Sequence, residues 1–220
     1  WLIYFRLALL HLPMSESASL PPAASGSAGK VQLTPADWIK AATEVLVDKS
    51  IDAVRVDVLA KGLKVTRGSF YWHFQDRDDL LRQLLKSWRD AATEQIISRF
   101  EGSGANPEAL VRELASLPFR GQSAVSSASI ELAIRAWARR DEMARQVVDE
   151  VDAKRLSYVS QCFVALGFGF QEAGMRAFVL YSYMIGESLM RAQGTETQRQ
   201  QRREFVEKML LERQIGRAHV

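Results

Sequence analysis

Cysteine and histidine are scarce in this sequence. Its 220 residues include one cysteine, Cys162, and three histidines, which are scattered at positions 11, 73 and 219. A single thiol excludes an intrachain disulfide, and the scattered histidines do not supply the ligand set of a zinc site. We therefore expect no metal and no cofactor, and we expect the protein to act in the reducing cytoplasm.

Long hydrophobic runs are also missing. The apolar start WLIYFRLALLHLP is shorter than the ~20 residues of a membrane-spanning helix, and it lacks a secretory cleavage site. We expect it to be translation upstream of Met14, with a short membrane-surface anchor as the alternative. Residues 15–29 are rich in serine, alanine, glycine and proline, so residues 1–33 are expected to be a disordered or non-native extension. The tail IGRAHV, residues 215–220, resembles a translated sequencing adapter.

The motifs of common enzymes are absent as well. No glycine-rich phosphate loop follows a strand pattern, and the stretch GFGF at residues 167–170 only joins two predicted helices. Cys162 lies in an apolar segment with no histidine nearby in the sequence, so it lacks the partner of a thiol nucleophile. We expect a protein that is not an enzyme.

Apolar residues at helical spacing are what the sequence contains throughout. Thr34, Pro35 and Asp37 supply an N-cap, a first-turn proline and a first-turn acid, and they predict a helix that ends near Asp48. Further helices are predicted at residues 55–63, 66–74, 76–100, 108–117, 130–138, 141–165, 172–193 and 196–214. No alternating strand pattern occurs.

The expected fold is therefore all-α. Two short helices separated by a tight turn form a helix-turn-helix, so residues 34–80 are expected to be an N-terminal three-helix DNA-binding domain. The long helix at 76–100 would join it to a C-terminal helical bundle that spans residues 81–214.

The stretch VTRGSFYWHF, residues 65–74, combines aromatic rings with polar tips. On a helix, Phe70 and Phe74 share the face that would pack on the preceding helix, while Arg67 and Tyr71 lie one turn apart on an outward face. Thr66 at one end and His73 and Arg77 at the other add donors, and Gly68 allows close approach to a groove wall. Phosphates and base edges accept hydrogen bonds from such a surface, and a short helix fits the ~12 Å major groove.

The local charge favours the same interpretation. Between Arg55 and Arg89 there are eight basic and four acidic residues, a surplus of four positive charges, whereas the whole chain carries a net charge of +3. The alternative is that these charges only solvate helix faces. Together with the ring and hydroxyl pattern, the surplus predicts binding to double-stranded DNA.

The segment LAKGLKVTRGSFYWHFQDRDDLL resembles the DNA-binding signature of the TetR family of bacterial transcriptional regulators, and WIKAATEVLVDKSIDAVRVDVLA resembles that family's first two helices. The resemblance implies DNA contacts by Thr66, Arg67, Ser69, Tyr71, Trp72, His73 and Arg77. We assign Arg67 and Ser69 to base edges and Tyr71, His73 and Arg77 to the backbone, while Trp72 fits either groove contact or domain packing.

Lys64 departs from the family pattern, which commonly has glycine in this turn. A lysine in a left-handed turn carries roughly 1 kcal/mol of strain. A contact between its ammonium group and a phosphate could offset that strain.

For the C-terminal half, the resemblance implies dimerisation through the last two helices and a pocket for a small effector. The dimer candidates are Gly174, Ala177, Ile185, Gly186 and Leu189, with ordinary helix core as the alternative. The pocket candidates are Trp137, Tyr158, Phe163, Tyr181 and Met184, with Arg135 or Gln161 to orient a polar group; bundle core is again the alternative.

These features predict a DNA-binding transcriptional regulator, a repressor that a small-molecule effector releases from its operator. Its expected partners are a double-stranded DNA operator, a second copy of the chain and an unknown effector, with no membrane. The alternative is a helical homodimer that keeps this fold but binds another protein instead of DNA.

Overall fold

The structure, a computed structural model, describes residues 33–102, 104–190 and 193–212, except for the side chains of residues 95, 96, 99 and 100. The predictions for the N-terminal extension up to residue 32 and for the adapter-like tail lie outside these residues. All regular elements of the described part are helices, which confirms the all-α prediction. None of the described helices is both long and apolar enough to cross a lipid bilayer.

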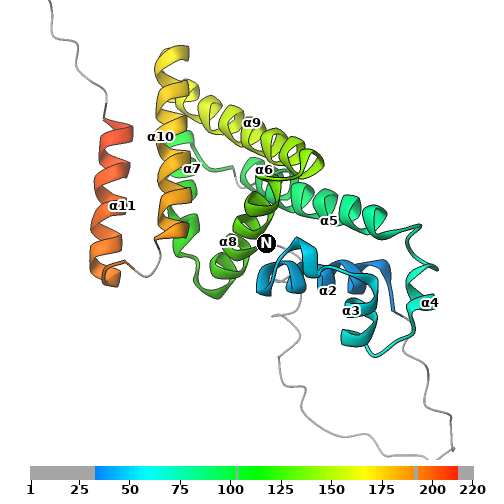
Figure 1. Ribbon diagram of the computed structural model, residues 1–220. Helices are drawn as coiled ribbons and strands as arrows, with labels where there is room; N and C mark the ends of the chain where they lie inside the picture. Colours follow the sequence, from blue (N-terminus) through cyan, green and yellow to red (C-terminus); the bar gives the residue numbers. More distant parts are fainter. Residues whose placement is uncertain (1–32, 103, 191–192, 213–220) are drawn as a thin grey trace, which may run out of the picture. The chain divides into compact units, whose positions relative to one another are not determined.

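The helices follow one another in the order shown by Figure 1. They are α2 (Pro35–Asp48), η1 (Ile51–Ala53), α3 (Val56–Gly62), α4 (Arg67–Phe70), α5 (Arg77–Ala92), α6 (Glu94–Glu101), α7 (Pro107–Ser116), η2 (Leu117–Phe119), α8 (Gly121–Ala138), α9 (Glu142–Ala165), α10 (Phe170–Leu189) and α11 (Glu196–Leu211). The chain divides into two compact units between Leu84 and Leu85, within α5.

The N-terminal unit begins at the predicted cap. The Thr34 hydroxyl accepts a hydrogen bond from the backbone N–H of Asp37, and the Asp37 carboxylate accepts one from the backbone N–H of Thr34 at 2.7 Å. This capping box satisfies backbone groups that the first turn leaves unpaired, which is why α2 starts here.

An aromatic cluster fills the core of the N-terminal unit. The rings of Trp38 and Phe70 meet edge to face with centroids 5.3 Å apart, and Phe70 stacks on Phe74 at 5.2 Å. Both phenylalanines are buried, together with Leu59 of α3. The predicted inward face of the segment 65–74 is therefore confirmed.

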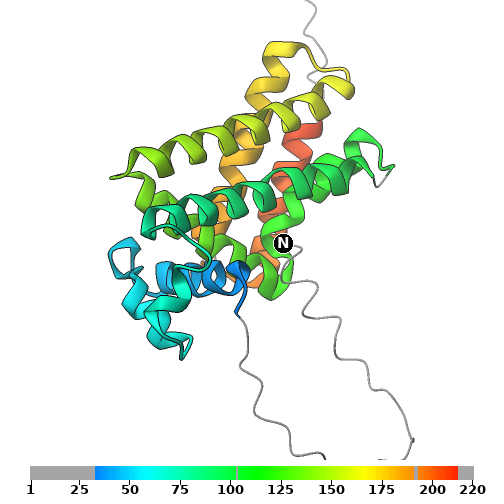
Figure 2. The same ribbon diagram turned by 90° about the vertical axis from the view of Figure 1, so that its right-hand side faces the viewer.

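The C-terminal unit is a bundle in which α9 lies against α7, α8 and α10. An apolar cluster joins residues of α7, α9, α10 and α11, with Phe163 and Leu180 fully buried. Helices α10 and α11 form a hairpin whose two arms lie side by side, as Figure 2 also shows. Thr195 starts α11 with a second capping box. Its hydroxyl accepts a hydrogen bond from the backbone N–H of Gln198, and the Gln198 side chain accepts one from the backbone N–H of Thr195.

The prediction of one long helix at 76–100 is wrong. Helix α5 ends at Ala92, and α6 begins at Glu94 after a one-residue break at Thr93. The buried Thr93 hydroxyl donates to the Arg89 carbonyl at 2.8 Å, a bond that bends helices, and the Ala92 carbonyl accepts from the Arg155 guanidinium at 3.0 Å.

The predicted helix at residues 66–74, which we call the recognition segment, is also less regular than predicted. Its α-helix spans only Arg67–Phe70, and the next three residues form a turn. The backbone N–H of His73 bonds to the Phe70 carbonyl three residues earlier, which is a tighter turn than that of an α-helix.

Candidate functional site

The turn between α3 and α4 is built around Lys64. Its φ of 57° lies in the left-handed region, as the sequence predicted. The N–H of Val65 bonds to the Ala60 carbonyl, and the N–H of Lys64 bonds to the Lys61 carbonyl, which is the Schellman pattern that ends a helix. Because this pattern requires a left-handed residue, Lys64 carries backbone strain that glycine would avoid.

The segment that follows exposes its polar tips. Thr66, Arg67 and Gly68 are exposed, and Ser69 and His73 are half-buried. Tyr71 is 55% exposed and Trp72 is 87% exposed, so neither ring serves as core. Their exposure beside the two buried phenylalanines produces a surface of hydroxyls, rings and one guanidinium.

Three positive charges around the turn have no acidic partner. In the segment from Arg55 to Arg89, five of the eight basic side chains form ion pairs with neighbouring carboxylates, such as Arg55 with Asp57 at 2.7 Å. Among the described residues, only Lys61, Lys64 and Arg67 of this segment lack such a pair, and all three are exposed. The sequence analysis did not single out Lys61 as a DNA contact. Its unpaired charge becomes visible only when the ion pairs of the neighbouring basic residues are known.

Arg77 does not project freely, although the resemblance assigned it to phosphate. Its Nε donates to the Val54 carbonyl at 2.6 Å, and its Nη2 donates to the Ile51 carbonyl at 2.8 Å. The guanidinium thus ties the start of α5 to η1 and to the residue after it. This geometry makes Arg77 a positioning residue, since even its Nη1 lies 3.8 Å from a carboxylate oxygen of Asp78.

Replacing Arg77 with methionine is expected to lower the free energy of unfolding by about 1–3 kcal/mol, because two carbonyls lose a charged donor. The slope of log affinity for DNA against log salt should stay unchanged, since few phosphate contacts are lost. Urea denaturation and a salt series measure the two quantities, and Arg82→Met is the control, because Arg82 has only an exposed ion pair at 3.9 Å. An unchanged stability with a slope reduced by about one would identify Arg77 as a phosphate ligand instead.

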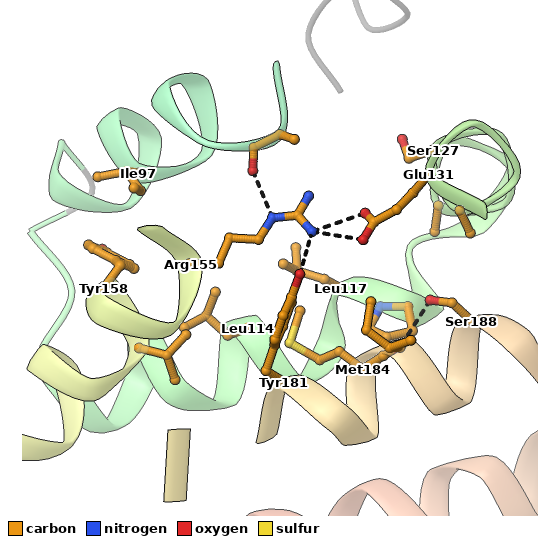
Figure 3. A pocket seen from close by; sticks show the side chains of 16 residues that line it. Ile97, Leu114, Leu117, Ser127, Glu131, Arg155, Tyr158, Tyr181, Met184 and Ser188 are labelled. Carbon is orange, nitrogen blue, oxygen red and sulfur yellow. Dashed lines mark hydrogen bonds and ion pairs between the residues drawn. The ribbon is translucent and has the colours of Figure 1, made fainter. Parts of the chain in front are cut away.

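The C-terminal unit contains a cavity of about 100 Å³, lined by residues of α6, α7, η2, α8, α9 and α10 and by the end of α5. Apolar side chains such as Leu114, Leu117 and Val159 form most of its wall. Figure 3 shows Arg155, Glu131 and Tyr181 meeting on one side of it. The cavity therefore has one polar side.

A hydrogen-bonded network of five residues forms this polar side and continues behind it. Arg155 Nη1 donates to both Glu131 oxygens and to the Tyr181 hydroxyl, each at 3.0 Å. Arg135 donates to Glu131, Asp152 and Tyr181, and the Tyr181 hydroxyl donates to Asp152 at 2.5 Å. Burial raises the pKa of Tyr181 to about 12, so its hydroxyl keeps its proton near neutral pH. Burial is the largest single influence on the pKa of Arg155 and would lower it, but the charge of Glu131 and the interactions with Tyr181 together outweigh burial, so the pKa is raised.

Three of the five predicted pocket residues line this cavity: Tyr158, Tyr181 and Met184. Trp137 and Phe163 do not, because both are buried in the core. Of the two polar candidates, Arg135 stands in the network behind the cavity and Gln161 is exposed and bonded to Ser157. The sequence analysis missed Arg155 and Glu131, since charged residues on long helices normally face solvent.

The predicted dimer residues divide between two faces of α10. Gly174 and Leu189 are exposed and Gly186 is half-buried, whereas Ala177 belongs to the protomer's own core and Ile185 lines the cavity. Ala177 and Ile185 are therefore not available to a partner. The exposed apolar residues of this hairpin that the sequence analysis missed include Met175, Phe178, Phe205 and Met209.

Comparisons with known proteins identify both the fold and the N-terminal unit. No match was found among curated proteins. A TetR-family transcriptional regulator from Rhodococcus sp. shares 19% identity and a TM-score of 0.64, over 81% of this chain and 98% of that one. A transcriptional regulator from Saccharomonospora viridis in complex with choline shares 17% identity and a TM-score of 0.67, over 81% and 98%. FadR from Bacillus subtilis in complex with stearoyl-CoA shares 16% identity and a TM-score of 0.59, also over 81% and 98%.

At these identities the solved structures show the fold alone. The family model described as bacterial regulatory proteins of the tetR family matches residues 39–84, which include α3, the turn and α4. The N-terminal unit is therefore a DNA-binding helix-turn-helix of the kind found in the bacterial regulatory proteins of the tetR family.

Proposed function

We propose that the protein is a cytoplasmic, homodimeric repressor, not an enzyme, and that a small molecule in the C-terminal cavity releases it from its operator. One observation carries the DNA-binding part of this proposal: Phe70 and Phe74 are buried while Arg67 and Tyr71 are exposed. The two phenylalanines thus anchor the recognition segment in the core of the N-terminal unit, and the exposed Arg67 and Tyr71 can contact DNA.

The contacts divide into base readout and backbone contact. We assign Arg67 and Ser69 to base edges, because an arginine can bond two acceptors of guanine and a serine hydroxyl suits any base. Thr66, Tyr71 and His73, with the unpaired ammonium groups of Lys61 and Lys64, supply donors to phosphates. A Cβ atom added at Gly68 would meet only the Thr66 hydroxyl oxygen, at 3.8 Å. Glycine is thus not required by the protein's own packing, and its small size favours close approach to the groove.

A dimer through the α10–α11 hairpin fits the exposed apolar side chains. On α10, Met175 and Phe178 are 60% and 62% exposed, and Leu189 lies on the same face at about 100° per residue. On α11, Phe205 is 68% exposed, with Met209 one turn away. Exposed apolar side chains on two adjacent helices are typical of a protein interface, and a two-fold dimer would give the protein two DNA-binding heads.

Replacing Phe178 and Phe205 with aspartate is expected to convert the dimer to a monomer, because each two-fold interface would then bury four carboxylates. Analytical ultracentrifugation measures the mass, and we expect the dissociation constant to rise at least about 100-fold. Val164→Asp is the control, because Val164 is 44% exposed but lies on α9. A double variant that stays dimeric at micromolar concentration would place the interface elsewhere.

The proposed effector acts by shifting an equilibrium between two arrangements of the dimer. A ligand can release DNA only if it binds better to a dimer whose heads do not fit the two half-sites. Helix α5 begins in the N-terminal unit and ends at Ala92, whose carbonyl is bonded to the cavity residue Arg155. The choline and stearoyl-CoA complexes of two structural neighbours support the view that this fold can hold small molecules.

The proposal is tested by selecting duplexes from a random pool with the purified protein. We expect one enriched sequence with two related half-sites about 34–36 Å apart, or a multiple of that spacing. A protein-interaction module with the same fold would enrich no sequence.

A further inference from the structure

The cavity of the C-terminal unit is small for a ligand site. Its volume is about 100 Å³, whereas an apolar cavity of about 150 Å³ holds benzene. An occupant that lies wholly inside this volume is therefore no larger than about one six-membered ring. A long acyl chain would extend beyond it.

The polar side of the cavity is already balanced in charge. Arg135 and Arg155 carry two positive charges, and Glu131 and Asp152 carry two negative charges, joined by hydrogen bonds of 2.5 to 3.1 Å. An anionic ligand would meet Glu131 without a spare cation, and a cationic ligand would meet Arg155 without a spare carboxylate. Moving either charged ligand out of water costs free energy, and this site has no unpaired opposite charge to offset that cost.

One donor of the network remains free. Arg155 uses Nε for the Ala92 carbonyl and Nη1 for Glu131 and Tyr181, while its Nη2 has no hydrogen-bond partner among the described residues. Figure 3 shows this nitrogen without a dashed line, on the side of the guanidinium turned away from Tyr181. The Ser127 hydroxyl, which also lines the cavity, makes no hydrogen bond within the described part of the chain either.

From these features we infer that the effector is a compact, uncharged molecule, about one ring in size, with a single hydrogen-bond acceptor such as a ketone or lactone oxygen. The acceptor takes the free Nη2 of Arg155, with Ser127 as a second donor, and the apolar remainder lies against Leu114, Leu117 and Met184. This inference rests on the proposed function, because it names the class of effector for that site.

Four probes of similar size test this ligand class. Cyclohexanone has the acceptor, methylenecyclohexane replaces its oxygen with CH2, and cyclohexanecarboxylate and cyclohexylammonium carry opposite charges. Binding to the full chain is followed through the methyl signal of Met184, which lines the cavity, in protein with 13C-labelled methionine methyl groups. The signal is assigned with Met184→Leu.

We expect cyclohexanone to bind about tenfold more tightly than the hydrocarbon, as is usual for a hydrogen bond from a charged donor. Both charged probes should bind at least about tenfold more weakly than the ketone. Arg155→Met should abolish the preference for the ketone, whereas Arg145→Met, an exposed arginine of the same helix, should retain it.

Equal binding of the hydrocarbon, tighter binding of either charged probe, or no response to any probe would overturn the inference. The comparison in wild-type protein decides the question even if Arg155→Met does not fold. Release of a selected DNA duplex is measured separately. A ketone that binds as expected but leaves DNA affinity unchanged would contradict the proposed effector release, not the ligand class.

Discussion

Replacing Arg67 with alanine is expected to raise the dissociation constant for a selected DNA duplex at least about 30-fold. A well-placed arginine–guanine contact is worth about 1–3 kcal/mol, and a dimer loses it in both heads. Arg67 is exposed at the first position of α4, so the loss should come from DNA contact and not from folding. Fluorescence anisotropy at fixed salt measures the affinity, and circular dichroism checks the fold.

Arg145→Ala is the matched control, because it also removes one exposed arginine but from the C-terminal unit. It should change the affinity less than about threefold, because the proposed DNA contacts all lie in the N-terminal unit. Similar losses in both variants would mean that net charge alone drives binding. An unchanged affinity in Arg67→Ala would favour a protein-interaction module over a DNA-binding regulator.

Replacing Phe70 with alanine is expected to lower the free energy of unfolding of the N-terminal unit by about 3–5 kcal/mol, the usual cost of removing a buried phenylalanine. The ring is fully buried and touches Trp38, Tyr71 and Phe74 at centroid distances of 5.2 to 5.3 Å. Because these contacts fix the start of the recognition segment, DNA binding should fail together with stability. Urea denaturation followed by tryptophan fluorescence, to which the buried Trp38 contributes, measures the change.

Trp72→Ala provides the contrast from the same segment. Its side chain is 87% exposed, so its loss should alter stability by less than about 0.5 kcal/mol. If Trp72 touches DNA, only the affinity will fall. A large loss of stability in Trp72→Ala, or none in Phe70→Ala, would contradict the arrangement of rings in this unit.

The N-terminal unit was predictable because its signals are local. The Thr34–Asp37 capping box and the four-residue spacing of Phe70 and Phe74 act within one or two helical turns. Such signals are readable from sequence without knowing what lies across the core. The left-handed turn at Lys64 was expected for a different reason, because the family pattern commonly has glycine at this position.

The cavity and the exposed apolar hairpin were less predictable, because both depend on contacts between distant segments. Glu131 and Arg155 are 24 residues apart and belong to different helices, and either alone would be read as a solvated charge. Ala177 and Phe178 are adjacent in sequence, yet the first is buried and the second exposed. Which face of an apolar helix meets its own bundle is decided by the packing of the whole unit.

The break at Thr93 shows the same limit. The apolar period continues through it, so the sequence predicts one rod, but the hydrogen bonds of the Thr93 hydroxyl and the Ala92 carbonyl interrupt the helix. The bond from Arg155 comes from 63 residues away. Side-chain bonds of this kind leave no trace in hydrophobic spacing.

The central claim is that the polar tips of residues 66–73 contact DNA directly. NMR titration of the 15N-labelled full chain with a selected duplex tests it at the level of single residues. The account predicts that the backbone signals of Thr66, Arg67 and Gly68 and the side-chain signal of Arg67 shift most in the N-terminal unit. Shifts confined to other surfaces, with these signals unchanged at saturating DNA, would contradict it.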